Sequence, residues 1–223
     1  MKNVRPCRNN RRVRCQRAHD SQLAYLYLTA ACAIAGREEE GHAAAIICTI
    51  SIARKRGLGA RAVTVAATAI RTMQYGDIGI RIPYISAASQ PTAPDYSEFI
   101  VAVKAAYEKA GIGPKDVDFI ELQDNSVWQK LEMIELFGLC KPSEADRLLD
   151  HGGLDIGGKL PVNPSGGFQS FGEATTAMGV WHVFELTRQL RCEAGPNQVK
   201  GAKVGLSQTL GLGGNGAAFI FKR

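Results

Sequence analysis

The chain has 223 residues, enough for one large domain or two small ones with a buried core. Hydrophobic residues make up 45% and charged residues 22%, which excludes a disordered or fibrous chain. The formal net charge is +6, and residues 1–20 account for all of it, with seven Lys and Arg residues against Asp20. Residues 21–223 are therefore neutral and lack the clustered Lys and Arg of a nucleic-acid-binding surface, so we expect no nucleic acid partner.

The first forty residues differ from the rest. An arginine-rich start is followed by the apolar run 23–35, LAYLYLTAACAIA. Two interpretations stay open: a targeting segment, or a divergent remnant of a missing upstream domain. The run is shorter than the roughly 18–20 apolar residues that span a bilayer, so we expect no membrane span.

Several elements are predicted before residue 97. Residues 43–50, AAAIICTI, form a continuous apolar run typical of a buried strand. A brief helix over 51–57 ends at Gly57, and the β-branched stretch 62–70 predicts a second strand. Residues 71–96 contain Gly, Pro, Ser and Tyr without periodicity and predict a long loop.

From residue 97 the pattern is regular. Helices are predicted over 97–111, over 127–139 with Trp128, Leu131 and Ile134 on one face, and over 173–192; Ser143 and Asp146 open a short helix as a capping box. Strands are predicted over 117–122, 203–207 and 217–222, with glycine-rich turns at 152–158 and 163–167. This alternation of strands and helices predicts an α/β fold.

The six cysteines and four histidines are dispersed. The cysteines include no CxxC pair and no zinc-ligand spacing, which favours reduced thiols in a cytoplasmic protein. We expect neither a metal site nor a bound cofactor. The cysteines lie at positions 7, 15, 32, 48, 140 and 192, and the histidines at 19, 42, 151 and 182.

Three motifs are more specific than any of these elements: ELQDNS at 121–126, KLPVNPSGGFQSFGEATTAMG at 159–179, and VGLSQTLGLGGNGAAFIF at 204–221. In order and spacing they resemble the C-terminal domain of thiolases, with the sterol carrier protein-x type nearest. The resemblance implies a mixed sheet covered by helices, with an incomplete N-terminal half. It divides the chain into a basic divergent tail (1–40), the end of the N-terminal thiolase domain with a linker (41–96), and the C-terminal domain (97–223).

The resemblance also shows which catalytic side chains are replaced. Thiolases acylate a cysteine of the N-terminal half, and a histidine of a Gly-His-Pro motif assists it; here that motif reads Gly172-Glu173-Ala174. The His-Asp-Cys-Phe loop of the sterol carrier protein-x type reads Gln123 to Ser126, so the second cysteine is absent. In other thiolases the second cysteine lies in the last glycine-rich loop, at the position of Gly211. No thiolate beside a base is therefore expected.

Some polar groups remain at the family's active-site positions. Candidate catalytic residues are Glu173, Gln123 and Asn125. Glycines let the backbone approach a thioester or present N–H groups to an oxyanion. The candidate substrate-binding glycines are Gly211, Gly213, Gly214 and Gly166.

The resemblance implies an acyl-CoA-handling, thiolase-like protein of lipid metabolism that is inactive alone and acts as a subunit or binding partner. One thiolase half would expose an apolar face, so we expect self-association or a partner subunit. Two alternatives stay open. The chain could be a truncated, non-functional remnant, or a subunit that cleaves an acyl-CoA by retro-aldol chemistry with an OB-fold partner.

Overall fold

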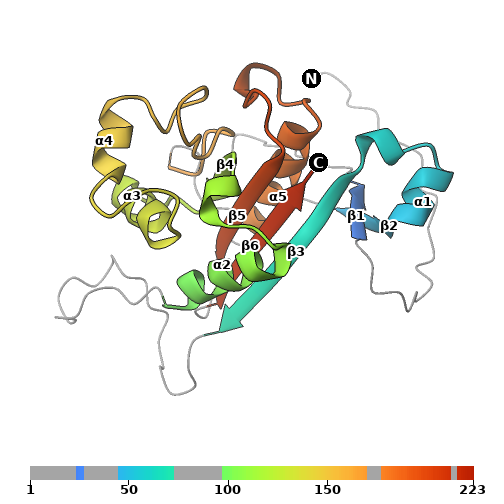
Figure 1. Ribbon diagram of the computed structural model, residues 1–223, viewed down its shortest axis with the longest axis horizontal. Coiled ribbons are helices and arrows are strands. Elements are labelled where there is room, and N and C mark those ends of the chain that lie inside the picture. Colours follow the sequence, from blue (N-terminus) through green and yellow to red (C-terminus); the bar gives the residue numbers. More distant parts are fainter. Residues whose placement is uncertain (1–23, 28–44, 73–96, 170–176, 212–214) are drawn as a thin grey trace, which may run out of the picture.

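A six-stranded sheet with helices on both faces organises the protein (Figure 1). The computed structural model describes residues 24–27, 45–72, 97–169, 177–211 and 215–223. The strands lie in the order β2-β1-β3-β6-β5-β4; neighbours are antiparallel except β4 and β5, which are parallel. Their bounds are β1 Ala24–Tyr27, β2 Ile46–Thr49, β3 Val63–Thr72, β4 Phe119–Leu122, β5 Val204–Gly211 and β6 Asn215–Lys222.

Five α-helices and three 3₁₀ turns connect these strands. The helix α1 lies beside β2 at one edge of the sheet, whereas α3 and α4 lie beyond β4 at the other (Figure 1). The helices are α1 Ile50–Lys55, α2 Ser97–Ala110, α3 Val127–Leu136, α4 Ala145–Asp150 and α5 Met178–Leu190. The 3₁₀ turns are η1 Gly59–Arg61, η2 Pro114–Asp116 and η3 Gly195–Asn197.

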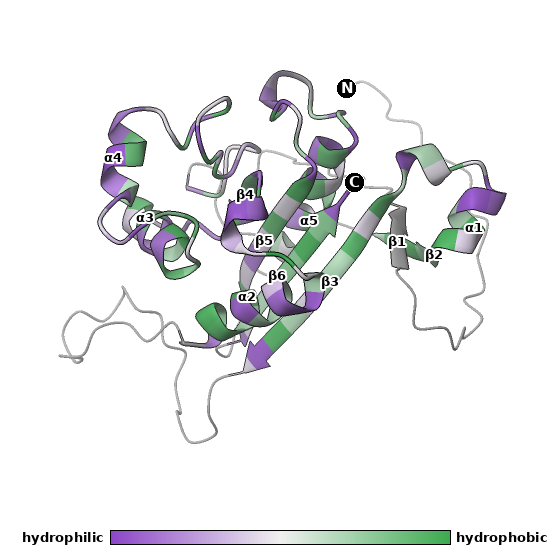
Figure 2. Cartoon of the chain, viewed as in Figure 1, coloured by the Kyte–Doolittle hydropathy of each residue, from purple (hydrophilic) through white to green (hydrophobic). Residues whose placement is uncertain are grey.

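The helix α2 covers one face of the sheet because its apolar residues recur at three- and four-residue steps. Phe99, Ala102 and Ala106 are buried and belong to a core cluster with residues of β3, β4, β5 and β6. Figure 2 shows hydrophobic residues along β3 and β6, the strands under α2. At the far end of α2, Lys222 Nζ donates to Ala110 O at 2.8 Å, which places a cation at the negative end of the helix dipole.

The helix α5 covers the opposite face. Its buried Leu186 and Leu190 pack with Phe119 of β4 and Phe221 of β6 in a second cluster. This approach requires a glycine at position 205 of β5, because an added Cβ would lie 2.5 Å from Leu186 and 2.6 Å from Phe119. The two helices therefore cover opposite faces of the sheet, α2 mainly over β3 and β6 and α5 mainly over β5.

Most of the predicted elements are confirmed. The strands predicted over 43–50, 62–70, 203–207 and 217–222 are present as β2, β3, β5 and β6, and the one over 117–122 begins at Phe119. The helix predicted from 173 begins at Met178, while residues 173–176 lie outside the described residues. The loop at 73–96 and most of the tail 1–40 also lie outside them, although Ala24–Tyr27 of the apolar run forms β1.

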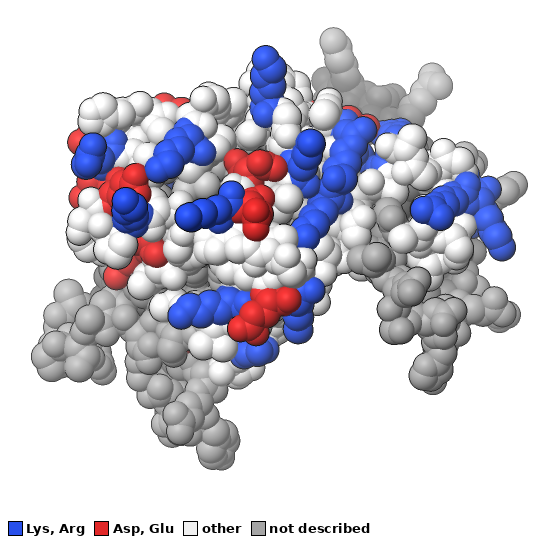
Figure 3. All heavy atoms as spheres, in the orientation of Figure 1, with Lys and Arg blue, Asp and Glu red and all other residues white. Residues whose placement is uncertain are grey.

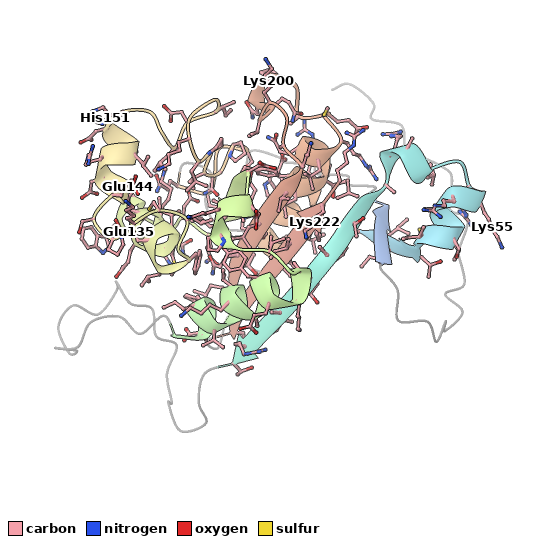
Figure 4. The ribbon with its side chains drawn as sticks, in the orientation of Figure 1. Lys55, Glu135, Glu144, His151, Lys200 and Lys222 are labelled. Carbon is pink, nitrogen blue, oxygen red and sulfur yellow. The ribbon has the colours of Figure 1, made fainter. Side chains whose placement is uncertain are left out.

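Three local predictions were wrong. The run 43–50 was predicted to be a buried strand, but β2 lies at the edge of the sheet and its Ile46 and Ile47 are exposed. Trp128 is 66% exposed, whereas Leu131 and Ile134 are buried. A three-residue step falls about 60° short of a full turn, so two steps rotate Trp128 about 120° away from Ile134. The capping box at Ser143 is absent: this residue has φ +62°, and the first amide of α4, Ala145 N, donates to Glu135 of α3 at 3.0 Å. Figure 4 shows Glu135 and Glu144 close together at this corner.

Charged side chains do not form a basic groove over the part of the surface that holds α2, α3 and α4, where Lys and Arg lie among Asp and Glu (Figure 3). Within the described ranges, no helix combines the length and the apolar character that a membrane span requires. Groups of three or more metal-ligating side chains are likewise absent from the same ranges.

Candidate functional site

The candidate site lies where β4 and β5 end. These two strands are parallel, so their carboxyl ends, at Leu122 and Gly211, lie at the same end of the sheet. Ligands of α/β proteins bind outside the carboxyl ends of parallel strands. The ELQDNS segment follows β4, and the turn at 163–168, which contains the NPSGG sequence, lies against it.

The outer edge of β4 is covered by residues 161–163. Ile120 N donates to Pro161 O at 3.1 Å, and Asn163 N donates to Ile120 O at 2.8 Å. The Asn163 side chain then continues this ladder: Oδ1 accepts from Leu122 N at 2.7 Å, and Nδ2 donates to Leu122 O at 3.0 Å. Asn163 has φ +51°, a conformation that asparagine tolerates better than most residues. The edge strand therefore has its backbone groups satisfied, and the turn is held to the end of β4.

Glu121 is the most unusual residue of this region. It is fully buried in β4, and both carboxyl oxygens bond the turn: Ser165 N lies 3.1 Å from Oε1 and Ser165 Oγ lies 2.7 Å from Oε2. The pKa of Glu121 is raised to about 8: burial is the main cause, the nearby Glu185 and Asp124 also raise it, and the two hydrogen bonds from Ser165 lower it. Glu121 can therefore hold a proton near neutral pH.

Asp124 is the second carboxyl group that holds the turn. Its Oδ1 accepts from Phe168 N at 2.7 Å, and burial raises its pKa. Gly167 packs directly on this carboxylate and has φ +69°; any Cβ at position 167 would overlap Asp124. The two adjacent glycines of NPSGG thus let the backbone fold around a buried acid.

The described candidates meet in this region. Gln123 is buried, and its Oε1 accepts from Leu210 N at 2.7 Å, which joins the end of β4 to the residue before Gly211. Asn125 is exposed on the same loop, and Gly166 is exposed in the adjacent turn with φ +110°. Gln123 is therefore buried, and Asn125 and Gly166 are exposed on the neighbouring loop and turn.

The remaining candidates lie outside the described residues: Glu173, Gly213 and Gly214. The Gly-Glu-Ala sequence and most of the last glycine-rich turn fall in the same two gaps. Of the four residues at the His-Asp-Cys-Phe positions, Ser126 has a local structural role, because its Oγ accepts from Gln129 N at 3.1 Å and caps α3.

Thiols and imidazoles do not meet within the described residues. His182 of α5 is fully buried, its Nδ1 lies 3.1 Å from Ser207 Oγ, and burial lowers its pKa to about 3. His151 contacts a backbone carbonyl of α4. Cys140 lies near α3, and burial raises the pKa of its thiol to about 11, so it is not a thiolate at neutral pH.

Sequence reasoning missed two hydrogen-bonded pairs: Glu121 with Ser165, and His182 with Ser207. A signal was available for Glu121, because a charged residue stood among the apolar residues of a predicted strand, 117–122. No such signal pointed to Ser207 or Ser165, whose partners lie 25 and 44 residues away in the chain. This arrangement can hold a proton and present backbone N–H groups; nucleophilic thiol chemistry has no described residues to perform it.

Comparison with known proteins agrees with this geometry. Residues 83–223 match the family described as thiolase C-terminal domain-like. The match covers more than half of the chain, and the protein therefore belongs to this family.

Individual relatives of this chain include sterol carrier proteins and a thiolase subunit. The chain is 38% identical to sterol carrier protein 2 of Rattus norvegicus over 183 residues, which are 82% of this chain and 32% of that protein. It is 30% identical to the benzoylsuccinyl-CoA thiolase subunit BbsB of Thauera aromatica over 175 residues, covering 78% of this chain and 41% of that subunit. The chain thus spans about a third of the length of the sterol carrier protein 2 relatives that it matches.

A solved structure has the same fold. The Ltp2-ChsH2(DUF35) aldolase superposes with a TM-score of 0.65 at 22% identity, over 80% of this chain and 43% of that chain. At this level of identity the likeness concerns the fold alone.

Proposed function

We propose that the protein is a thiolase-like subunit of acyl-CoA and lipid metabolism that binds a CoA thioester but does not transfer the acyl group by itself. One observation most directly supports the claim that the chain alone does not transfer the acyl group. At the end of β4, where the sterol carrier protein-x type has His-Asp-Cys-Phe, this chain has an amide held by the backbone, a buried acid, an exposed amide and a helix cap. None of these groups is a thiol, the nucleophile that thiolase chemistry uses.

The proposal includes a partner, either a second copy or a different subunit. Apolar side chains are exposed at the sheet edge formed by β2 and α1: Ile46 is 49% exposed, Ile47 56% and Ile52 43%. An edge strand with exposed isoleucines on both faces favours association with another chain. Free thiols at Cys48, Cys140 and Cys192 favour a reducing compartment, and we propose the cytoplasm.

Calorimetric titration of the purified chain with coenzyme A tests the binding half of the proposal. We expect a saturable binding heat with the unmodified chain. Asn125→Asp should lower the affinity for coenzyme A by about tenfold, because the new charge repels the anionic ligand at the candidate site. Asn197→Asp makes the same charge change on the exposed η3 turn, beside the start of β5 rather than its end, and should leave the affinity unchanged. No heat with the unmodified chain would favour the alternative of a non-functional remnant.

Loss of acetoacetyl-CoA enolate absorbance in the presence of CoA tests the catalytic half. We expect no turnover by the chain alone, so turnover that Glu173→Ala abolishes would overturn the proposal.

For association, sedimentation velocity should show a concentration-dependent oligomer that Ile47→Lys weakens. Val101→Lys, at a position on α2 that is 46% exposed, is the matched control, and a monomer at all concentrations would contradict self-association.

A second candidate is a lyase-type subunit that cleaves a carbon–carbon bond of an acyl-CoA together with an OB-fold partner. The buried Glu121 favours it, because a carboxyl group protonated near neutral pH can donate the proton that such a cleavage requires. Mass spectrometry of a β-hydroxyacyl-CoA incubated with the chain should then reveal retro-aldol products once the partner is added.

A further inference from the structure

Glu121 and Ser165 connect the interior of the protein with its surface. Glu121 is completely buried, whereas Ser165 is half-buried and the following Gly166 is exposed. The Glu121 Oε2–Ser165 Oγ distance is 2.7 Å, and Gly167 N donates to Ser165 Oγ at 3.4 Å. A single hydroxyl group therefore separates a buried acid from the outer side of the turn.

The surroundings of Glu121 favour its neutral form. The acids that face it are Glu185 on α5 and Asp124 at the end of β4. His182 on α5 is neutral and bonds Ser207, the register neighbour of Glu121 on β5. The nearest described cation on α5, Arg188, lies 3.5 Å from Glu185 rather than beside Glu121.

The protonation state of Glu121 decides where the Ser165 hydroxyl points. A serine hydroxyl donates one hydrogen bond and accepts two. When Glu121 is ionised, Ser165 must donate to Oε2, and its hydrogen points inward. When Glu121 is protonated, its own O–H can donate to Ser165 Oγ, which already accepts from Gly167 N. The Ser165 hydrogen is then free to point outward to a ligand.

We propose that Glu121 and Ser165 form a proton relay, in which Ser165 donates to an oxygen atom of a ligand on the 163–168 turn and Glu121 sets the direction of that donation. In the transfer step, the Ser165 hydrogen moves to a ligand oxyanion as the Glu121 hydrogen moves to Ser165 Oγ. The oxyanion gains an O–H bond, and the negative charge moves to Glu121. Ser165 is the group that contacts the ligand, and Glu121 is a positioning residue.

The ligand class rests on the proposed function, since the enolate or carbonyl oxygen of an acyl thioester is the acceptor this relay would take. The relay itself is independent of CoA. Its first test therefore uses the full chain without any ligand, and the failure of CoA binding would not be confused with the failure of the relay.

Infrared spectroscopy as a function of pH measures the relay directly, because a protonated carboxyl group has a C=O stretch distinct from that of a carboxylate. We expect one carboxyl band to persist above neutral pH, to titrate near pH 8, and to be absent in Glu121→Gln. Ser165→Ala should move the midpoint upward by about one pH unit, because ionised Glu121 loses a donor. Ser165→Thr keeps the hydroxyl and should restore the midpoint.

The matched control is Ser207→Ala, which removes a buried hydroxyl next to Glu121 in register but bonded to His182. Its midpoint should stay at the wild-type value. A carboxyl band already lost at pH 6, or identical midpoints for Ser165→Ala and the wild type, would overturn the relay.

Binding of acetoacetyl-CoA then tests the direction of donation. The wild-type affinity should fall as Glu121 ionises. Glu121→Gln should bind as tightly as the wild type at low pH and lose the pH dependence, because the Gln amide donates permanently to Ser165 Oγ. Ser165→Ala should bind about tenfold more weakly at low pH. A pH dependence that Glu121→Gln leaves unchanged would contradict the assignment.

Discussion

Replacing Asn163 by alanine tests whether its side chain completes the β4 edge. Its amide satisfies Leu122 N and Leu122 O at 2.7 and 3.0 Å. Leu122 is buried, so both backbone groups would lose their partner away from water. Each unsatisfied buried group costs about 1–3 kcal/mol, and alanine at a positive φ adds about 1 kcal/mol. We expect the free energy of unfolding to fall by about 3–7 kcal/mol.

Urea denaturation followed by far-UV circular dichroism measures this loss through the midpoint and slope. Asn163→Gly removes the same two hydrogen bonds without the steric cost of φ +51°, so it should lose about 1 kcal/mol less than the alanine variant. Hydrogen exchange of the Leu122 amide provides a local measurement and should accelerate in both variants. A loss below about 1 kcal/mol in both, or unchanged protection of Leu122, would refute the argument.

Three further changes have defined outcomes. As pH rises from about 4.5 to 8, the difference in free energy of unfolding between the wild type and Glu121→Gln should fall by up to about 5 kcal/mol, because Glu121 is protonated when folded and ionised when unfolded. The difference is measured because the lowered pKa of His182 changes stability in the opposite direction in both proteins. Gly167→Ala should cost at least about 2 kcal/mol, because its Cβ overlaps Asp124 at a positive φ. Trp128→Ala should change stability by no more than about 0.5 kcal/mol, since this side chain is 66% exposed.

Matched positions separate the causes of these effects. Gly57 has φ +71°, and an added Cβ there would have no described heavy atom within 4 Å, so Gly57→Ala isolates the backbone cost at about 1 kcal/mol. Leu131, on the buried side of the same helix as Trp128, should lose about 2–5 kcal/mol on truncation to alanine. Equal losses at positions 57 and 167 would contradict the Gly167 prediction, and equal losses at 128 and 131 would contradict the Trp128 prediction. A pH-independent difference in stability between the wild type and Glu121→Gln would contradict the Glu121 prediction.

Local sequence patterns were sufficient for most elements. The three- and four-residue recurrence of Phe99, Val103 and Ala106 predicted α2, and the buried face of that helix contains all three. The apolar stretches predicted the positions of β2, β3, β5 and β6. Burial did not follow from them in every case, because β2 is an edge strand with Ile46 and Ile47 exposed. The prediction failed for Trp128, where a short helix offered too few residues to fix which face is buried.

The candidate site was predicted only in part. The four described residues that the motifs indicated, Gln123, Asn125, Gly166 and Gly211, all lie at or beside the carboxyl ends of β4 and β5. The motifs did not separate residues that hold the loops from residues open to a ligand. Gln123 proved to be a buried link to Leu210, whereas Asn125 is exposed on the same loop.

The sequence by itself determined the α/β elements, the family resemblance and the replacement of the thiol and imidazole at the motif positions. Only the tertiary structure decided that NPSGG folds around Glu121 and Asp124, and that Glu121 is buried beside Ser165. The physical reason is that protonation and burial depend on partners far apart in the chain. Sequence spacing constrains the local backbone, but the pKa of a carboxyl group depends on which side chains the packed helices and strands bring around it.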